Sequence, residues 1–590
     1  MKTAMKLRTY ITTCVAALLC TSCDGDFFDK TPLTQVGESM DLFESESGLE
    51  TYTNGFYSYI DPSVILDDFT SDNCEHISNP PAIRKAIYTM PTALGSGGWD
   101  WSQLRDINYF IDHCSQSSLD ASIKNQYIAL ARFFRARFYF EKVKTFGDVP
   151  WYSHALNTDD DAELYKARTP RVEVMDSVLN DLNAAVQYLP ETKYRNRISK
   201  WSALAYKSRV CLYEGTWRKY HTEAGLTGAE KFLQESADAA LAVMNSQQYS
   251  LYTTGKPAED YAAMFQTDEA DLTEVLLAHS AAPGNFFYYT PNFTSTSNGN
   301  YGATASLIAD YPMADGRLFT EAYPDEAERN SMPCYQEMEN RDPRLTQTII
   351  HPGYIRIGTS TVAVNDFAEN RTGYQIIKRV GPPSEDQGGD TRDAIIIRYA
   401  EVLLNYAEAR AELGTLTQDD INRTINLIRQ RVGLPGRTLP LNTDQTQRDM
   451  YTHVSDPNIL EIRRERRIEL ALEGFRKDDL MRWAEGQRFR AVYEGIYISG
   501  LHELIDLDGD AKPDLYVLET NDEIPADKVD GVQYFRLSEV NGLSEGDKGR
   551  LIPYDQTLEP FEDWEYLNPI PTEELTLNPE LKQNPGWDNL

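Results

Sequence analysis

The sequence predicts a mainly α-helical protein in which stacked helical hairpins are joined to a loop-rich portion. Up to about residue 250, apolar residues recur at three- and four-residue spacing, which is the helical period. Short polar links separate several of these segments, as expected for helical hairpins. From about 249 to 395, Gly, Pro, Asn and Thr become frequent, and loops of this kind usually carry function.

Helical segments are predicted along most of the first half. The helix that begins near Trp101 shows the pattern clearly, with Leu104, Ile107 and Ile111 on one face. The other helices predicted in this half cover residues 42–60, 123–146, 172–188, 200–216 and 229–246.

The second half mixes short strands with returning helices. Strand-like runs occur at 275–278 and 374–377, each bounded by turn-forming residues. Helices are predicted at 397–413, 418–431 and 458–483. Roughly the last hundred residues are predicted to be mostly irregular, because Pro and Gly mark frequent turns there.

The N-terminus has the pattern of a secretory signal peptide. Lys2, Lys6 and Arg8 precede an apolar run at 11–20 that is too short to span a bilayer, and small polar residues follow it. The series Leu-Cys-Thr-Ser-Cys at 19–23 resembles a bacterial lipobox. We therefore expect residues 1–22 to be removed and Cys23 to be lipidated, which would tether the protein to a membrane outside the cytoplasm.

Composition limits the choice of partners. The 590 residues are 41% hydrophobic and 25% charged, with a formal net charge of -34. So acidic a surface repels nucleic acid and anionic lipid, and it suits neutral ligands and cations. We divide the chain into the signal peptide 1–22, an N-terminal helical region 23–250 and a C-terminal region 251–590.

Motifs for common catalytic and metal chemistry are missing from the sequence. It contains no HExxH, GxSxG, GxxxxGK[ST] or GxGxxG motif, and its eight histidines show no ligand spacing. The four cysteines beyond Cys23 are widely spaced without a CxxC pair, so a zinc site is not expected, although one or two disulfides remain open.

Three groups of segments resemble the SusD/RagB family of surface lipoproteins from the Bacteroidetes. The agreement covers essentially the whole mature chain in order, and NRDPRL at 340–345, YPMADG at 311–316 and DFFD at 26–29 support it. The three groups are IIRYAEVLLNYAEA at 396–409 with INLIRQRVGL at 425–434, IRRERRIELALEGFR at 462–476 with DLMRW at 479–483, and LNPIP at 567–571 with NP at 578–579 and QNPGW at 583–587.

This resemblance implies a fold, a function and partners. The fold would combine tetratricopeptide-like helical hairpins with a loop-rich ligand-binding portion, although the consensus residues of that repeat are absent. The protein would be a non-catalytic outer-membrane lipoprotein that captures oligosaccharide and passes it to a TonB-dependent, SusC-like transporter. Oligopeptide cargo is a variant. An extracellular glycoside hydrolase and a helical-repeat interaction scaffold are the alternatives.

The helices that carry the family motifs can also be explained without the resemblance, as helices that pack in a structural scaffold. In 398–409 the apolar residues fall on one face, while Glu401 and Glu408 lie elsewhere. In 462–472, five charged residues from Arg463 to Glu469 are spaced so that they can pair along the same helix.

Candidate sugar-binding residues are aromatic and polar side chains in loops. Sugar rings stack on aromatic faces, and carboxylates and amides bond their hydroxyls. Trp101 is expected in the core of its helix, whereas Trp99 follows a Gly-rich stretch and is expected to face the ligand. The predicted ligand-binding residues are Asp72, Trp99, Phe287, Tyr289 and Tyr301.

An acidic loop at 506–514 has the spacing of a calcium site. Asp506, Asp508, Asp510 and Asp514 occupy loop positions 1, 3, 5 and 9, and the carbonyl of Lys512 would be at position 7. The loop departs from an EF-hand, because Gly509 is at position 4 and position 12 is not Glu. The alternatives are a Ca²⁺ site and a plain acidic turn.

Overall fold

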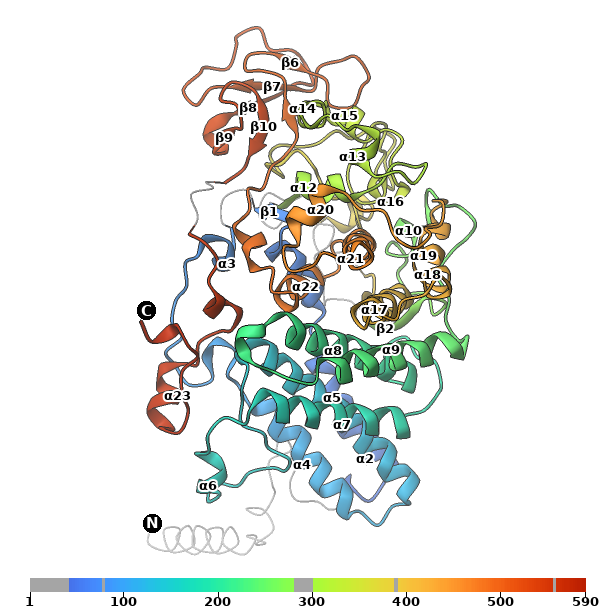
Figure 1. Cartoon of the computed structure of the whole chain (residues 1–590), viewed down its shortest axis with the longest axis vertical. Helices are drawn as coiled ribbons and strands as arrows, with labels where there is room; N and C mark the ends of the chain where they lie inside the picture. Colours follow the sequence, from blue (N-terminus) through green and yellow to red (C-terminus); the bar gives the residue numbers. More distant parts are fainter. Residues whose placement is uncertain (1–41, 77–79, 281–300, 387–390, 555–558, 590) are drawn as a thin grey trace, which may run out of the picture.

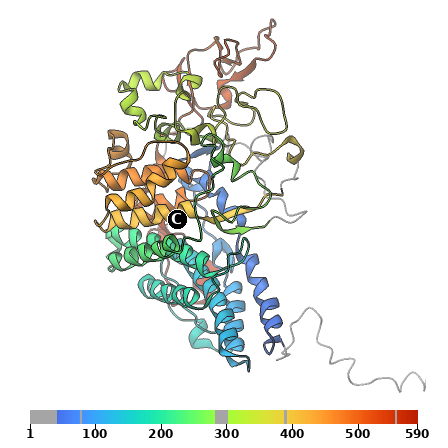
Figure 2. The same cartoon turned by 90° about the vertical axis from the view of Figure 1, so that its right-hand side faces the viewer.

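The structure is a computed structural model that describes residues 42–76, 80–280, 301–386, 391–554 and 559–589 (Figure 1). The protein is mainly helical. Most helices of the first half occupy the lower part of Figure 1, most helices of the second half lie above them, and short strands between residues 497 and 552 form the top. The C-terminal helix at 572–577 is an exception, because it lies beside the lower helices. The side view in Figure 2 shows the helices of both halves stacked in successive layers.

The helices of the first half lie close to where the sequence predicts them. Neighbours pack in order, α4 on α5, α5 on α7, α7 on α8 and α8 on α9. The predicted helix 42–60 is the exception, because its α-helical part ends at Asn54 and continues as a 3-10 turn, Gly55–Tyr59. The helices are α2 Glu46–Asn54, α4 Ser102–Gln116, α5 Ala121–Phe146, α7 Arg171–Tyr188, α8 Lys200–Tyr220 and α9 Ala229–Ser246.

Helix α8 is the buried centre of this stack. Its N-terminus is capped by Ser199, whose side chain accepts a hydrogen bond from the Ser202 amide. Most of its side chains are buried between α7 and α9. At Gly215 a Cβ atom would lie only 2.8 Å from Cγ of Leu233, so the close approach of α9 requires glycine there.

The helices of the second half continue the stack, because α9 packs on α17 and α17 on α21. Two predicted helices are each broken in two. The first break is at Thr424, whose φ of -129° and ψ of -91° are not helical, and the second includes Leu472 and Gly474 with positive φ. The helices are α17 Tyr399–Glu412, α18 Gln418–Arg423, α19 Ile425–Arg431, α20 Gln445–Met450, α21 Pro457–Glu469 and α22 Arg476–Arg482.

Short helices connect these larger elements. They are α3 Ala82–Lys85, α6 Asp161–Leu164, α10 Asp260–Ala263, α12 Ala305–Asp310, α13 Phe319–Ala322, α14 Glu326–Asn330, α15 Cys334–Glu337, α16 Pro343–Thr346 and α23 Thr572–Leu577. The 3-10 segment η4, Pro62–Thr70, precedes the first strand.

The described strands form four small sheets. The orders are β1–β3, β2–β4, β5–β10–β9 and β6–β7–β8, and only β7 and β8 pair in parallel. The predicted strand 374–377 is reduced to isolated bridges at Gln375 and Ile376. The strands are β1 Cys74–His76, β2 Val275–His279, β3 Tyr301–Ala303, β4 Ala394–Arg398, β5 Tyr497–Ile498, β6 Leu504–Ile505, β7 Leu515–Leu518, β8 Gln533–Arg536, β9 Gly542–Leu543 and β10 Gly549–Ile552.

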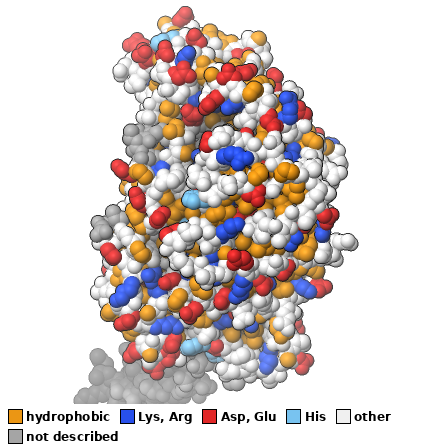
Figure 3. Space-filling view, in the orientation of Figure 1, with side chains coloured by type: hydrophobic (Ala, Val, Ile, Leu, Met, Phe, Trp, Pro, Cys, Tyr) orange, Lys and Arg blue, Asp and Glu red, His pale blue; other side chains and the backbone are white. Residues whose placement is uncertain are grey.

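One large apolar core joins the helical layers, and a second lies under the strands near the C-terminus. The four described cysteines, Cys74, Cys114, Cys211 and Cys334, are buried and carry free thiols. Within the described part of the chain, no helix has both the length and the apolar character needed to cross a membrane. On the face drawn in Figure 3, acidic and basic side chains are interspersed over the described surface.

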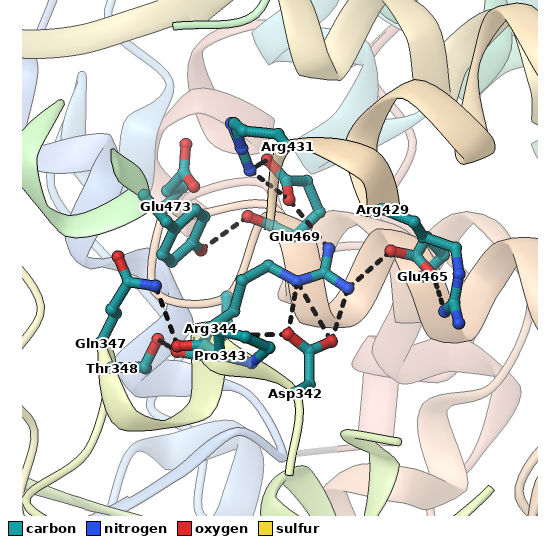
Figure 4. Close-up of polar contacts among 12 residues, drawn as sticks. Asp342, Pro343, Arg344, Gln347, Thr348, Arg429, Arg431, Glu465, Glu469 and Glu473 are labelled. Atoms are coloured by element: carbon teal, nitrogen blue, oxygen red, sulfur yellow. Dashed lines mark hydrogen bonds and ion pairs between the residues drawn. The ribbon is translucent and has the colours of Figure 1, made fainter. Parts of the chain in front are cut away.

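Helix α21 carries buried charges, and most of their ion-pair partners lie on other elements. The spacing between Arg463 and Glu469 allows pairing along the helix, but all of these residues are buried and most of their ion pairs reach other elements. The carboxylate of Glu469 accepts hydrogen bonds from Arg344 at 2.9 Å and Arg431 at 2.7 Å (Figure 4). It also accepts one from Arg398 at 2.7 Å. Such charges are tolerated inside a protein only when they are paired in this way.

The same interactions control how Glu469 titrates. Burial alone would raise the pKa of the Glu469 carboxyl, but Arg431, Arg398 and Arg344 together lower it below its ordinary value. A carboxyl with a lowered folded-state pKa contributes stability that is fully present above its unfolded-state pKa. That stability is lost as the pH falls towards the folded-state pKa.

We predict that Glu469→Gln lowers the free energy of unfolding by about 3–5 kcal/mol, because it leaves buried guanidinium groups without their counter-charge. Chemical denaturation at neutral pH measures this loss. The variant should also lose less stability than the wild type when the pH is lowered from about 5 to about 3.

The matched control is Glu259→Gln, which removes the charge of an exposed pair with Lys256. Its unfolding curve should coincide with that of the wild type. Equal stability of Glu469→Gln and Glu259→Gln would contradict the structural role given to Glu469.

Candidate functional site

A cavity of about 550 Å³ lies between three segments that are distant in the sequence. Its first wall is the stretch 95–108, which leads into α4, its second is the loop 150–165, and its third is formed by α23 and the residues that follow it. The volume falls within the range of roughly 300–1,000 Å³ typical of small-molecule sites.

Aromatic rings from two walls form a corner of this cavity. Trp101 and Tyr152 are both half-buried, and their ring centroids are 5.8 Å apart with the planes at 83°. Trp99 stands behind Trp101 at 5.4 Å and 76°, and it packs edge-on against Phe146 at 4.8 Å. The exposed ring of Tyr165 lies on the second wall.

Local sequence explains how the tryptophans are presented. Gly95, Gly97 and Gly98 all have positive φ, a conformation that glycine adopts without strain, so the chain turns sharply before Trp99. The carboxylate of Asp100 then accepts hydrogen bonds from the Ser102 amide at 2.9 Å and its hydroxyl at 3.0 Å, which helps to start α4.

Two lysines lie near the rings without lining the cavity. Lys142 Nζ is 5.6 Å from the Trp101 ring centroid, and Lys166 Nζ is 4.4 Å from that of Tyr152. Burial lowers the pKa of Lys142 to about 8. These contacts help to hold both rings in place and leave their cavity sides to a ligand.

The three walls are joined to one another by hydrogen bonds. Asn108 of the first wall donates to the carbonyls of Tyr152 at 3.0 Å and His154 at 3.1 Å. The Gly95 amide donates to Glu574 at 2.8 Å, which connects the first wall to α23. The circle closes through Asn578, whose side-chain amide donates to the Lys166 carbonyl at 3.0 Å.

The structure places both tryptophans at the cavity, and Trp99 is the more buried of the two. Trp99 is only 3% exposed and reaches the cavity as part of the core, whereas Trp101 is half-buried and lines the cavity. The reason is that the helix begins at Ser102, so Trp101 sits at its end and does not extend its apolar face. Sequence reasoning missed Tyr152 and the whole third wall. An aromatic pair next to Pro150 was a weak signal for Tyr152, and the wall formed by α23 had none.

Asp72 lies in the interior and not at the cavity. It is fully buried and pairs with Arg476 at 2.6 Å, Arg488 at 3.2 Å and Arg467 at 3.4 Å. Burial alone would raise the pKa of Asp72, but these arginines together lower it. A carboxylate held by three guanidinium groups is not available to a sugar hydroxyl, so the structure argues against Asp72 as a ligand-binding residue.

The remaining candidates are distributed differently. Tyr301 in β3 is half-buried, stacks on Phe69 at 4.3 Å and 10°, and does not line the cavity. Phe287, Tyr289 and the lipidation candidate Cys23 lie outside the described residues.

The acidic loop brings three of its four carboxylates together. Asp506, Asp508 and Asp514 each place a carboxylate oxygen within 4.8 Å of the others. Partial burial, with the neighbouring charge of Asp508, raises the pKa of Asp514. Asp510 does not join this group, because its carboxylate is exposed and pairs with Lys512 Nζ at 2.7 Å. Three carboxylates at this spacing fit the oxygen ligation that Ca²⁺ prefers.

Comparison with known proteins decides the family. A sequence model of the SusD family matches residues 246–587, which is more than half of the chain. The chain belongs to the SusD family. A second model, for starch-binding proteins associating with the outer membrane, matches residues 100–212, a range that includes the start of α4 and Tyr152.

Other SusD-like proteins are similar in sequence to this member over most of its length. It is 26% identical to SusD-like protein P2 of Formosa agariphila, over 72% of this chain and 77% of that protein. A SusD-like protein from Bacteroides ovatus is 23% identical over 79% and 81% of the two chains.

Solved structures confirm the mainly helical, tetratricopeptide-like fold. A SusD-like protein from Bacteroides fragilis NCTC 9343 superposes with a TM-score of 0.68 at 24% identity, covering 94% of this chain and all of that one. A SusD-like carbohydrate-binding protein from the same strain gives a TM-score of 0.65 at 22% identity, covering 92% and 100%.

The calcium site stays a prediction, and thermal unfolding tests it. We expect Ca²⁺ to raise the melting temperature and a chelator to lower it, because an ion that binds only the folded state stabilises that state. Asp508→Asn should abolish the response, since Asp508 belongs to the close group of three carboxylates.

Asp510→Asn is the matched control and should keep the calcium response. A wild-type melting curve that is unaffected by Ca²⁺ and chelator would leave the loop as an acidic turn. A calcium response retained by Asp508→Asn would contradict the assigned ligands.

Proposed function

We propose that this SusD-family protein is a cell-surface lipoprotein that binds glycans and passes them to a TonB-dependent outer-membrane transporter. The observation that carries the proposal is the aromatic corner of Trp101 and Tyr152 in a cavity of about 550 Å³. Pyranose rings present C–H faces that pack on aromatic rings, and polar groups at the rim bond the hydroxyls.

Polar groups that can hydrogen-bond sugar hydroxyls also line the cavity around the aromatic corner. The rim carries Asp100, Arg105, Asn157 and Glu574, which supply both donors and acceptors for sugar hydroxyls. The names of the related proteins support the same ligand class, since one solved relative is a carbohydrate-binding protein.

The protein acts by binding in this proposal and performs no chemistry on the glycan. The two carboxylates at the cavity have structural partners, since Asp100 bonds Ser102 and Glu574 bonds the Gly95 amide. Glycoside hydrolysis needs one carboxyl free to donate a proton and a second that attacks or activates water. A carboxylate that holds a wall together is poorly placed for either role.

The leader sequence and the family support the proposed location and partner. The lipobox-like series before Cys23 supports a lipid anchor, and the second family model supports association with the outer membrane. A glycan bound at the outer membrane still has to cross it, and in this proposal the TonB-dependent transporter is the channel that imports it.

The decisive experiment removes one ring from the corner. Trp101→Ala should weaken binding of the cognate oligosaccharide about five- to 150-fold, the equivalent of roughly 1–3 kcal/mol for an aromatic hot spot. Calorimetric titration measures the affinity, and product analysis should recover the sugar intact. The melting temperature should change little, because Trp101 is only half-buried.

Two further variants serve as comparisons. Trp99→Ala should cost about 3–5 kcal/mol of stability, because it empties a buried position. Tyr188→Ala removes an exposed ring that does not line the cavity and should bind normally. Normal binding by Trp101→Ala would reject the cavity as the glycan site.

Anchoring is tested separately at Cys23. Cys23→Ala should release the protein into the medium or periplasm and abolish metabolic labelling with a fatty acid, because the acylated thiol is gone. Cys74→Ala is the control, since this buried cysteine lies far from the signal in the sequence and should not affect labelling. Label retained by Cys23→Ala would reject the lipobox.

A further inference from the structure

The charges around the cavity do not suit an anionic ligand. Among the described residues that line it, Arg105 is the single arginine or lysine, and it shares the lining with the two carboxylates Asp100 and Glu574. Sulfated and uronate-rich glycans are normally held by several guanidinium or ammonium groups, because each anionic group needs a charge partner.

The nearby lysines do not supply that charge. The amine of Lys142 donates to the Gly98 carbonyl, and that of Lys166 donates to the Trp151 carbonyl at 2.5 Å and to Glu163 at 2.8 Å. Neither lysine lines the cavity. Both amines therefore donate to protein groups beside the rings.

The rings also form a corner and not a flat platform. Trp99 and Trp101 meet at 76°, and Trp101 and Tyr152 meet at 83°. An extended, ribbon-like glycan would need ring faces that lie parallel along its path. Nearly perpendicular rings instead enclose a single sugar residue from two sides.

The walls of the cavity form a closed circle. The first wall bonds the second through Asn108 and the third through Glu574, and the second bonds the third through Asn578. These connections hold the three walls in fixed positions relative to one another. A chain end or a side branch can enter through the mouth without disturbing them.

From these observations we infer that the cavity takes the uncharged end or branch of a glycan, about one to three sugar residues long for a volume of this size. This inference rests on the proposed function and specifies its ligand class. The corner binds one ring, the rim groups bond the hydroxyls of that ring and its neighbour, and the remainder of the glycan lies outside the cavity.

The test is a glycan array followed by titration of a length series. The array carries neutral, uronate-containing and sulfated oligosaccharides from dimer to octamer, probed with the wild-type protein and with Trp101→Ala. The best-bound neutral series is then titrated from dimer to hexamer. Affinity should change less than about threefold between trimer and hexamer. It should also change less than about twofold between roughly 0.05 and 0.5 M sodium chloride.

The outcomes separate the inference from the function on which it rests. An affinity that rises more than about tenfold from trimer to hexamer, or strongest binding to sulfated or uronate glycans, overturns the inference and keeps glycan binding. Binding that Trp101→Ala retains in full overturns the assignment of the cavity. Absence of binding to every glycan on the array overturns both proposals.

Discussion

Buried arginine–carboxylate pairing is the interaction on which the C-terminal half of this protein depends. Glu469 at the end of α21 is bonded by arginines from α16, the end of β4 and α19. Glu465, one turn earlier, pairs with Arg344 at 2.7 Å and Arg429 at 3.2 Å. Burying a carboxylate here costs free energy unless all of its arginine partners are in place. Few alternative packings of these segments would therefore be stable.

A second ionic cluster extends this constraint towards the functional cavity. Asp72, just before β1, pairs with arginines of α21, α22 and the segment that follows α22. Nearby, Arg84 of α3 bonds Glu75 at 3.2 Å and the Phe489 carbonyl at 2.8 Å. The chain then continues from α3 directly to the glycine-rich turn before Trp99. The position of the first cavity wall is thus coupled to helices several hundred residues away in the sequence.

The C-terminal segment completes the same arrangement from the other side. The Asn568 backbone amide donates to the Thr145 carbonyl at 2.7 Å, and the Asn584 side chain donates to the Phe146 carbonyl at 3.1 Å. Both contacts hold the C-terminal segment against the end of α5. Because α23 follows Asn568 after only a few residues, this docking places the third cavity wall opposite the first.

Local signals in the sequence predicted the helices well and the site only in part. Five helices of the first half, α4, α5, α7, α8 and α9, lie close to where apolar spacing predicts them, and the predicted helix 42–60 is shorter. The breaks at Thr424 and after Glu469 were not predictable from spacing, since the apolar pattern continues through both. The partners of the charges on α21 were also hidden, because spacing shows only which residues can pair within one helix and not which distant segments pack against it. For the same reason Asp72 looked like a loop residue that could meet a ligand.

The buried ring of Trp99 helps to determine how the accessible rings of the cavity are positioned. Trp99 is wedged between Trp101 and Phe146, so it fixes the position of Trp101 from behind. A ring that is already immobile loses little conformational freedom when a sugar stacks on it, which leaves more of the contact energy for binding. The three glycines before Trp99 permit the turn, and the bonded walls keep it in place. Part of the rigidity at this corner therefore comes from packing behind the rings. Trp99 lines the cavity itself and also supports Trp101 from behind.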